Sequence, residues 1–127
     1  MQAPARRPTI SWLLFSPTGR AGRQVFILGW LFWLMINSYT VTSLALHQED
    51  EELFRVFSLL FFAGFAASFA STIMLSIKRL HDMGLSGLLV LVLFIPAVSF
   101  VMLFVLFLWP SRPGPNPYGP APDWPQT

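Results

Sequence analysis

The chain has 127 residues, with eight basic residues, six acidic residues and no cysteine. Apolar residues make up 54% of it, which is a high fraction for a soluble domain of this length. The absence of cysteine excludes disulfides, thiolate catalysis and Cys-ligated zinc or iron–sulfur centres. The formal net charge of +2 is too small to suggest a nucleic acid partner. The composition therefore predicts one membrane domain over residues 1–127.

The first apolar segment is residues 10–15, with the sequence ISWLLF. Six residues are too few to cross a bilayer. Two interpretations remain open: a short helix lying in the membrane interface with Trp12 and Phe15 dipping into the headgroups, or part of an unstructured arm.

Three uncharged apolar runs follow, and they cover residues 25–46, 56–77 and 88–109. Each has 22 residues, and a helix of that length spans roughly 33 Å, against a hydrocarbon core of about 30 Å. An isolated strand would leave its backbone unpaired in lipid. A cleaved signal peptide has a shorter apolar region, of about 7 to 15 residues. We therefore expect an all-α integral membrane protein with three transmembrane helices in a small bundle.

The second run carries small residues at helical spacing. Ala63, Ala67 and Ser71 are four residues apart and share one helix face. Small side chains let helix backbones approach closely in lipid, where apolar burial does not drive association. We expect this row to face another helix.

Polar residues also occur inside the spans. Asn37, Ser68 and Ser99 fall at a similar depth, which predicts a shared polar contact. A transport pathway is the alternative, but no ionisable residue accompanies the three. Pro96 predicts a kink in the third span, because it lacks the N–H that a helix needs there. A re-entrant hairpin at Pro96 is disfavoured, since each arm is too short to cross.

The connections before the first span and between the second and third contain most of the charge. Arg20 and Arg23 are three residues apart, so their guanidinium groups can bind lipid phosphates or reach Asp82. Asp82 is the one acidic residue expected on that side of the membrane, and Arg79 precedes it. We hypothesise an Arg–Asp82 ion pair that latches the two connections together.

His81 beside Asp82 raises the question of acid–base or metal chemistry. Adjacent residues point apart on a helix or strand, and His47 is expected about 30 Å away across the bilayer. We therefore predict no catalytic residue, metal site or cofactor.

The chain ends in a segment, residues 110–127, that contains seven prolines. Such a segment is expected to be an irregular, solvated tail. Basic residues near the ends of the spans predict its side of the membrane: Arg6, Arg7, Arg20, Arg23, Lys78 and Arg79 on one side, and Arg55 and Arg112 on the other. The positive-inside rule then places the N-terminus in the cytoplasm and the C-terminus outside.

Three sequence elements resemble those of a family of bacterial inner-membrane proteins called domain of unknown function 805. The resemblance rests on Arg20 and Arg23 before the first span, on an RLHD-x-G-x-SG loop, and on a PG-x-N-x-YG-x-x-P-like tail. The loop residues are Arg79, Leu80, His81, Asp82, Gly84, Ser86 and Gly87, and the tail residues are Pro113, Gly114, Asn116, Tyr118, Gly119 and Pro120. The resemblance covers nearly the whole chain and implies an inner-membrane location, but it implies no activity.

Three functional classes remain. An interaction or assembly protein with a basic cytoplasmic face is favoured, with membrane lipids and a homo-oligomer or another membrane protein as partners. A subunit of a transporter or channel is the alternative, although transport predicts charged residues within the spans. A lipid-headgroup enzyme is disfavoured by the arguments on His81.

Overall fold

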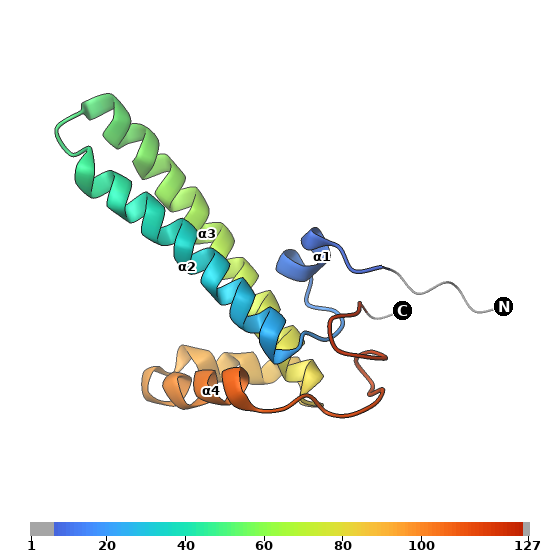
Figure 1. Ribbon diagram of the computed structural model, residues 1–127. Helices are drawn as coiled ribbons and strands as arrows, with labels where there is room; N and C mark the ends of the chain where they lie inside the picture. The colour runs from blue at the N-terminus through green and yellow to red at the C-terminus, as the bar shows by residue number, and fades with distance from the viewer. Residues whose placement is uncertain (1–6, 126–127) are drawn as a thin grey trace.

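The computed structural model describes residues 7–125 of the chain. Within that range every regular element is a helix, and the all-α prediction is confirmed. The elements in order are α1 (Ile10–Phe15), α2 (Arg23–Leu46), α3 (Glu51–Asp82), the 3₁₀ helix η1 (Gly87–Phe94) and α4 (Pro96–Leu108). Figure 1 shows α2 and α3 as a long antiparallel pair, with η1 and α4 lying across one end of it.

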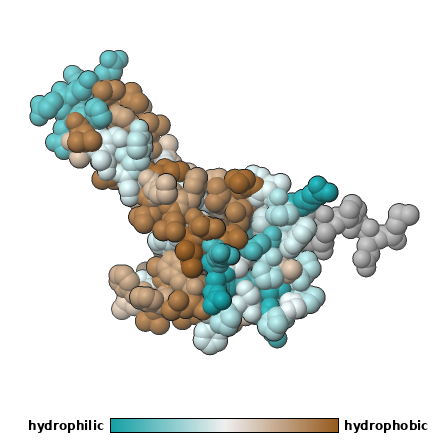
Figure 2. Space-filling view, in the orientation of Figure 1, coloured by the Kyte–Doolittle hydropathy of each residue, from teal (hydrophilic) through white to brown (hydrophobic). Residues whose placement is uncertain are grey.

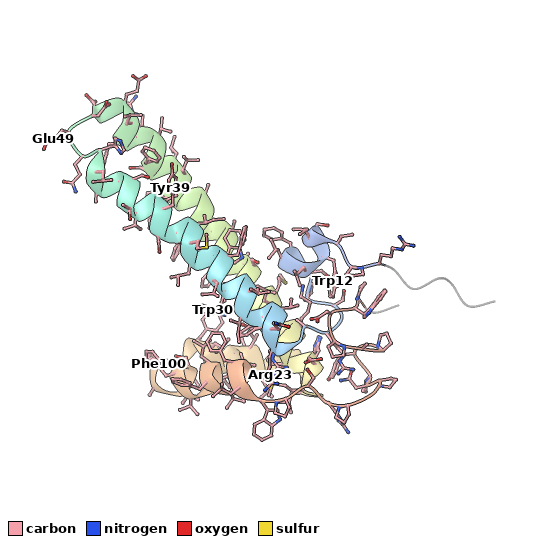
Figure 3. All side chains as sticks on the ribbon, viewed as in Figure 1. Trp12, Arg23, Trp30, Tyr39, Glu49 and Phe100 are labelled. Atoms are coloured by element: carbon pink, nitrogen blue, oxygen red, sulfur yellow. The ribbon has the colours of Figure 1, made fainter. Side chains whose placement is uncertain are left out.

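The helices α2 and α3 are both long and apolar enough to cross a membrane, and they contain the predicted spans 25–46 and 56–77. The short connection between them carries Glu49 at the end opposite Arg23 (Figure 3). Asp50 caps α3, because its carboxylate accepts a hydrogen bond from Leu53 N–H at 3.0 Å. Figure 2 shows this far tip as hydrophilic and the shaft beneath it as largely hydrophobic.

Polar side chains join α2 to α3 in the middle of the pair. Trp33 Nε1 donates to Ser71 Oγ at 2.8 Å, and Asn37 Nδ2 donates to Ser68 Oγ at 3.1 Å. In an apolar surrounding each such bond satisfies groups that have no access to water. The predicted contact between Asn37 and Ser68 is therefore present.

The predicted packing row on α3 is partly wrong. Ser71 is fully buried against α2, but Ala63 is exposed and Ala67 is only half-buried. The face of α3 that meets α2 instead contains Gly64, where an added Cβ would lie 3.8 Å from Ile36 Cγ2, and the buried Ser68. Ser71 belongs to this face because it is seven residues from Gly64, whereas Ala63 is rotated away from it.

The third predicted span is not one helix. Residues 88–109 are divided between η1 and α4, joined at Ile95, which is extended with φ −96° and ψ 111°. Pro96 occupies the first turn of α4, where no N–H is needed, and it disfavours helical geometry in the residue before it. Pro96 therefore breaks the helix instead of kinking it, and the chain makes the hairpin that the sequence argument had set aside.

The break also changes the position of Ser99. Its hydroxyl donates to the carbonyl of Pro96 at 2.7 Å within the first turn of α4. The hairpin lies across the base of the α2–α3 pair (Figure 1), so Ser99 does not join Asn37 and Ser68. The predicted three-residue contact is wrong for Ser99, because the prediction assumed a continuous third span.

The two ends of the described chain lie at the same end of the α2–α3 pair (Figure 1). Asp123 N–H donates to Arg20 O at 3.0 Å, and the Asp123 carboxylate accepts from Gly22 N–H at 2.7 Å. The tail therefore packs on the segment that precedes α2. The prediction that the termini lie on opposite sides of a membrane assumed three crossings, and the packing of the tail on the segment before α2 does not support it. Of the basic residues used in that prediction, Arg6 lies outside the described residues.

Residues 10–15 form a helix, α1, so the interpretation as part of an unstructured arm is wrong. Thr9 caps it by accepting from Trp12 N–H at 3.1 Å. The other end is held by Lys78 of α3, whose ammonium donates to the carbonyls of Trp12 (2.6 Å) and Leu13 and lies 4.5 Å from the Trp12 ring centroid. A cation at the carbonyl end of a helix and over an aromatic face is favourably placed.

Candidate functional site

Three of the sequence-predicted residues meet in a buried ion cluster. Arg20 Nε lies 3.1 Å from Asp82 Oδ1, and Arg79 Nη1 lies 2.8 Å from Asp82 Oδ2. All three side chains are fully buried. Arg20 comes from the loop before α2, and the other two come from the last turn of α3, so the carboxylate joins two segments far apart in sequence.

The remaining donors of Arg20 bind the backbone of the tail. Its Nη2 donates to Arg112 O at 2.7 Å, and its Nη1 donates to Gly114 O at 2.8 Å. A guanidinium has five donors in a fixed fork and no acceptor, so it can satisfy a carboxylate and several carbonyls together. Arg20 therefore fixes the start of the tail against the end of α3.

Arg79 fixes the end of α4 against the end of α3 in a similar way. Its Nε donates to Leu106 O at 2.8 Å, and its Nη2 donates to Trp109 O. These carbonyls belong to the last turn of α4, where backbone acceptors have no partner inside the helix and the helix dipole favours a cation. Ser111, just beyond the helix, donates its hydroxyl to Asp82. We call Arg20, Arg79 and Asp82 with these backbone partners the clamp.

His81 faces away from the clamp. Its ring stacks on Tyr118 of the tail, with centroids 4.1 Å apart and an interplanar angle of 1°, and its Nδ1 is 3.1 Å from Gly19 O. Asn116 Nδ2 donates to His81 O at 2.9 Å. His81 lies beyond the uncharged stretch 56–77, and burial lowers its pKa below 6.5, with the Gly19 carbonyl partly opposing that shift. A neutral ring that donates from Nδ1 fits both contacts.

The turn after α3 requires glycine at position 84. Gly84 has φ +79°, a conformation that side chains rarely adopt. The position of a Cβ there is also 2.7 Å from Arg112 Nη1. The glycine in the loop motif therefore serves both the turn and the close approach of the tail.

Arg23 stands apart from the residues predicted with it. It is exposed, and its Nη1 donates to Leu108 O at 3.2 Å. Arg20 reaches Asp82 from the loop before α2, whereas Arg23, in the first turn of α2, binds the end of α4. Sequence reasoning did not identify Ser111 or the backbone carbonyls of the tail, because the tail was expected on the other side of the membrane.

The contacts of the clamp hold the tail and the end of α4 against the end of α3. Each charged group in it has a partner, and Asp82 is enclosed by two guanidinium groups, so its carboxylate is not available as a base. His81 and Asp82 make separate sets of contacts and do not form a dyad. Across residues 7–125, no three His, Asp or Glu side chains gather in a way that could hold a metal ion.

Comparisons with known proteins agree with the motif resemblance. The model of a family described as protein of unknown function (DUF805) matches residues 14–120, a range that includes the clamp. The chain is 33% identical over 112 residues to the inner membrane protein YhaI of Escherichia coli strain K12, which covers 84% of this chain and 86% of that protein. The YhaI protein of Escherichia coli O157:H7 matches with the same figures. No solved structure matches the chain.

Proposed function

This chain belongs to the DUF805 family, and on that premise we propose that it is an assembly component of the bacterial inner membrane. In this proposal α2 and α3 cross the bilayer, the η1–α4 hairpin lies in the leaflet at their base, and the clamp holds the tail at the cytoplasmic surface. The name of the YhaI relative supports the inner-membrane location.

The distribution of charge supports a cytoplasmic position for the end that carries the termini. Arg55 is at the far end of the α2–α3 pair, while the other basic side chains of residues 7–125 are at the end with the tail: Arg7, Arg20, Arg23, Lys78, Arg79 and Arg112. The positive-inside rule favours the basic end in the cytoplasm. The charge difference between the two ends is larger than the sequence predicted, because Arg112 lies at the basic end with the tail.

The observation that carries the assembly role is the small-residue face of α3. Ala63 and Ala66 are exposed, and Ala67 and Ala70 are half-buried. The exposed part of this face, at Ala63 and Ala66, is left uncovered by the described residues 7–125. Faces of small residues allow two helices to approach closely in lipid, where van der Waals packing drives association. We propose that α3 of a second copy packs on this face.

The competing functions receive less support. Transport requires polar groups along a path, whereas Asn37 and Ser68, the polar pair at mid-depth between α2 and α3, are bonded to each other. Headgroup chemistry requires a free acid or base, whereas Asp82 and His81 are occupied in holding the tail. An interaction role needs only the exposed faces.

The test is the oligomeric state of Ala63→Leu and Ala67→Leu, measured by crosslinking in native membranes and by native mass spectrometry in mild detergent. We expect the wild-type chain to form homo-oligomers and both variants to shift to monomers, because leucine prevents the backbones from approaching. Ala45→Leu is the matched control, since Ala45 is exposed near the far end of α2. A monomeric wild type, or variants that still associate, would refute the proposal.

A further inference from the structure

An open cavity of ≈ 270 Å³ lies between the base of the α2–α3 pair and the upper side of the hairpin. All four of these elements contribute to its lining. The lining is almost entirely apolar and includes Phe69 and Ile73 of α3, Leu93 and Phe94 of η1, and Phe100 of α4. The hairpin therefore creates a pocket that a straight third span would not form.

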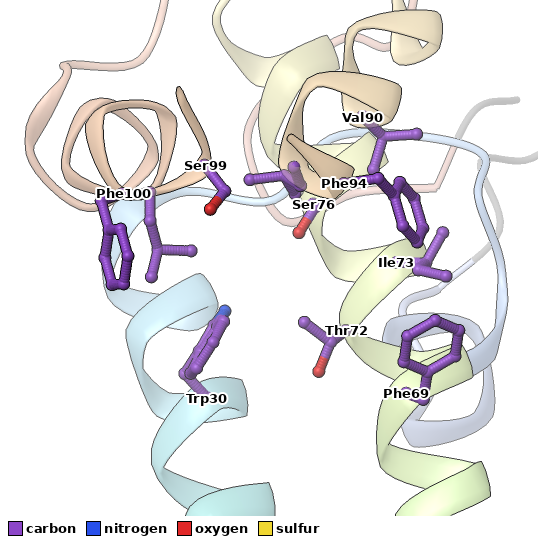
Figure 4. A pocket seen from close by; sticks show the side chains of 11 residues that line it. Trp30, Phe69, Thr72, Ile73, Ser76, Val90, Phe94, Ser99 and Phe100 are labelled. Carbon is purple, nitrogen blue, oxygen red and sulfur yellow. The ribbon is translucent and has the colours of Figure 1, made fainter. Parts of the chain in front are cut away.

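Two polar groups in this lining have no partner. Trp30 Nε1 and Ser76 Oγ are both buried and make no hydrogen bond, and Ser76 is fully buried. Figure 4 shows the Trp30 nitrogen and the hydroxyls of Ser76 and Ser99 around the same opening. A buried donor without an acceptor costs free energy, so two of them at one cavity indicate that a ligand supplies the acceptor.

The depth of these groups restricts the ligand. Ser76 is two residues from the charged end of α3, and Trp30 is five residues from the start of the first apolar run, which corresponds to depths of about 3 Å and 8 Å along a helix. This is the layer between headgroups and hydrocarbon. The ester groups of glycerophospholipids occupy that layer, and their carbonyls accept hydrogen bonds.

Space for the rest of such a molecule continues along α2 and α3. A second cavity of ≈ 260 Å³ shares Trp30, Phe69 and Thr72 with the first and extends toward Leu34 and Phe65. Its lining is mostly apolar, and Asn37 and Ser68, which also line it, are hydrogen-bonded to each other. The second cavity extends toward the middle of the membrane, which is the direction that an acyl chain takes from its ester.

We propose that this pocket binds one diacyl phospholipid, with an ester carbonyl accepting from Trp30 Nε1 and Ser76 Oγ and the acyl chain lying along the second cavity. Water fits less well, because an ordered water needs two to four polar partners and most of the lining is apolar. This proposal shares with the proposed function only the placement of the chain in a bilayer, and it does not depend on the oligomeric state.

The test compares ester lipids with ether lipids. The full chain is reconstituted into nanodiscs of phosphatidylethanolamine and phosphatidylglycerol, in either the diacyl ester or the dialkyl ether form, and bound lipid is counted by native mass spectrometry. We expect one retained ester lipid per chain and about thirtyfold weaker retention of the ether form, the change that corresponds to about 2 kcal/mol for two hydrogen bonds. This comparison uses the wild-type chain, so it does not depend on the folding of a variant.

Trp30→Phe and Ser76→Ala should each reduce the ester preference to about fivefold, because one of the two hydrogen bonds remains, while leaving the oligomeric state unchanged. Trp109→Phe is the matched control, because its ring is 57% exposed and does not line either cavity. Equal retention of ester and ether lipids by the wild type would overturn the proposal. So would retention of a free fatty acid in place of a phospholipid, an empty pocket, or a pocket filled by a second copy.

Discussion

The second and third apolar runs of this chain have the same length and the same lack of charge, but they fold differently. Residues 56–77 lie within one straight helix, α3, whereas residues 88–109 are divided between η1 and α4. The second run has no proline, and the third has Pro96 near its middle. The comparison shows that hydropathy reports how much apolar chain is available, while the continuity of the helix decides whether it can cross.

The partners of the two runs also differ. The middle of α3 is bonded to α2 through side chains, Trp33 to Ser71 and Asn37 to Ser68. The hairpin packs on α3 through Phe94 against Phe69, and its side-chain hydrogen bonds are at its end, where Arg79 binds the last carbonyls of α4 and Arg20 binds the tail that follows. The hairpin should therefore depend on the clamp in a way that the α2–α3 pair does not.

The largest expected effect is on the side of the membrane that the tail occupies. The chain has no cysteine, so single cysteines introduced by Gln48→Cys and Pro115→Cys can be labelled with a membrane-impermeant maleimide. We expect labelling at position 48 in intact spheroplasts and at position 115 only after permeabilisation. Labelling of both in intact spheroplasts would mean that residues 88–109 cross the bilayer as a third helix.

The next effect is on stability. Asp82→Asn removes the charge between two buried guanidinium groups, and breaking a buried ion pair in this way costs about 3–5 kcal/mol. We expect limited proteolysis to cut the tail after residue 109 while circular dichroism still reports the α2–α3 helices. Glu51→Gln is the control, because the Glu51–Arg55 pair is largely exposed and such pairs contribute little.

A cooperative loss of all helix in Asp82→Asn would contradict the separation of the two regions. An unchanged tail would show that the clamp does not hold the hairpin. Glu51→Gln, the control, should show the same cleavage pattern and the same melting temperature as the wild type.

The smallest effect is that of pH on the tail. The pKa of His81 is lowered in the folded chain, so below pH 6.5 the unfolded chain binds more protons and stability falls as the pH drops through the lowered value. Above pH 6.5 this contribution is fully present. We expect protease cleavage of the tail to increase in that acidic window, and His81→Phe, which can still stack on Tyr118, to remove the pH dependence. A pH dependence that survives in His81→Phe would assign it to another group.

The sequence by itself determined the helical class, the two spans within α2 and α3, the end of the molecule where Arg20, Arg79 and Asp82 lie, and the Asn37–Ser68 contact. These follow from local rules: an uncharged run must be helical in lipid, and residues at the same depth can meet. Both rules use only the order of residues along each helix.

Only the tertiary structure decided the path of the chain after residue 87. Pro96 is compatible with a kinked span or with a break, and the sequence contains no measure of which is favoured. The break is accompanied by contacts between residues far apart in the chain, in which Arg79 binds the end of α4 and Arg20 binds Gly114. Those bonds place the tail and hold the end of the hairpin that encloses the cavity beside Trp30 and Ser76. They depend on how whole segments meet, which no local pattern specifies.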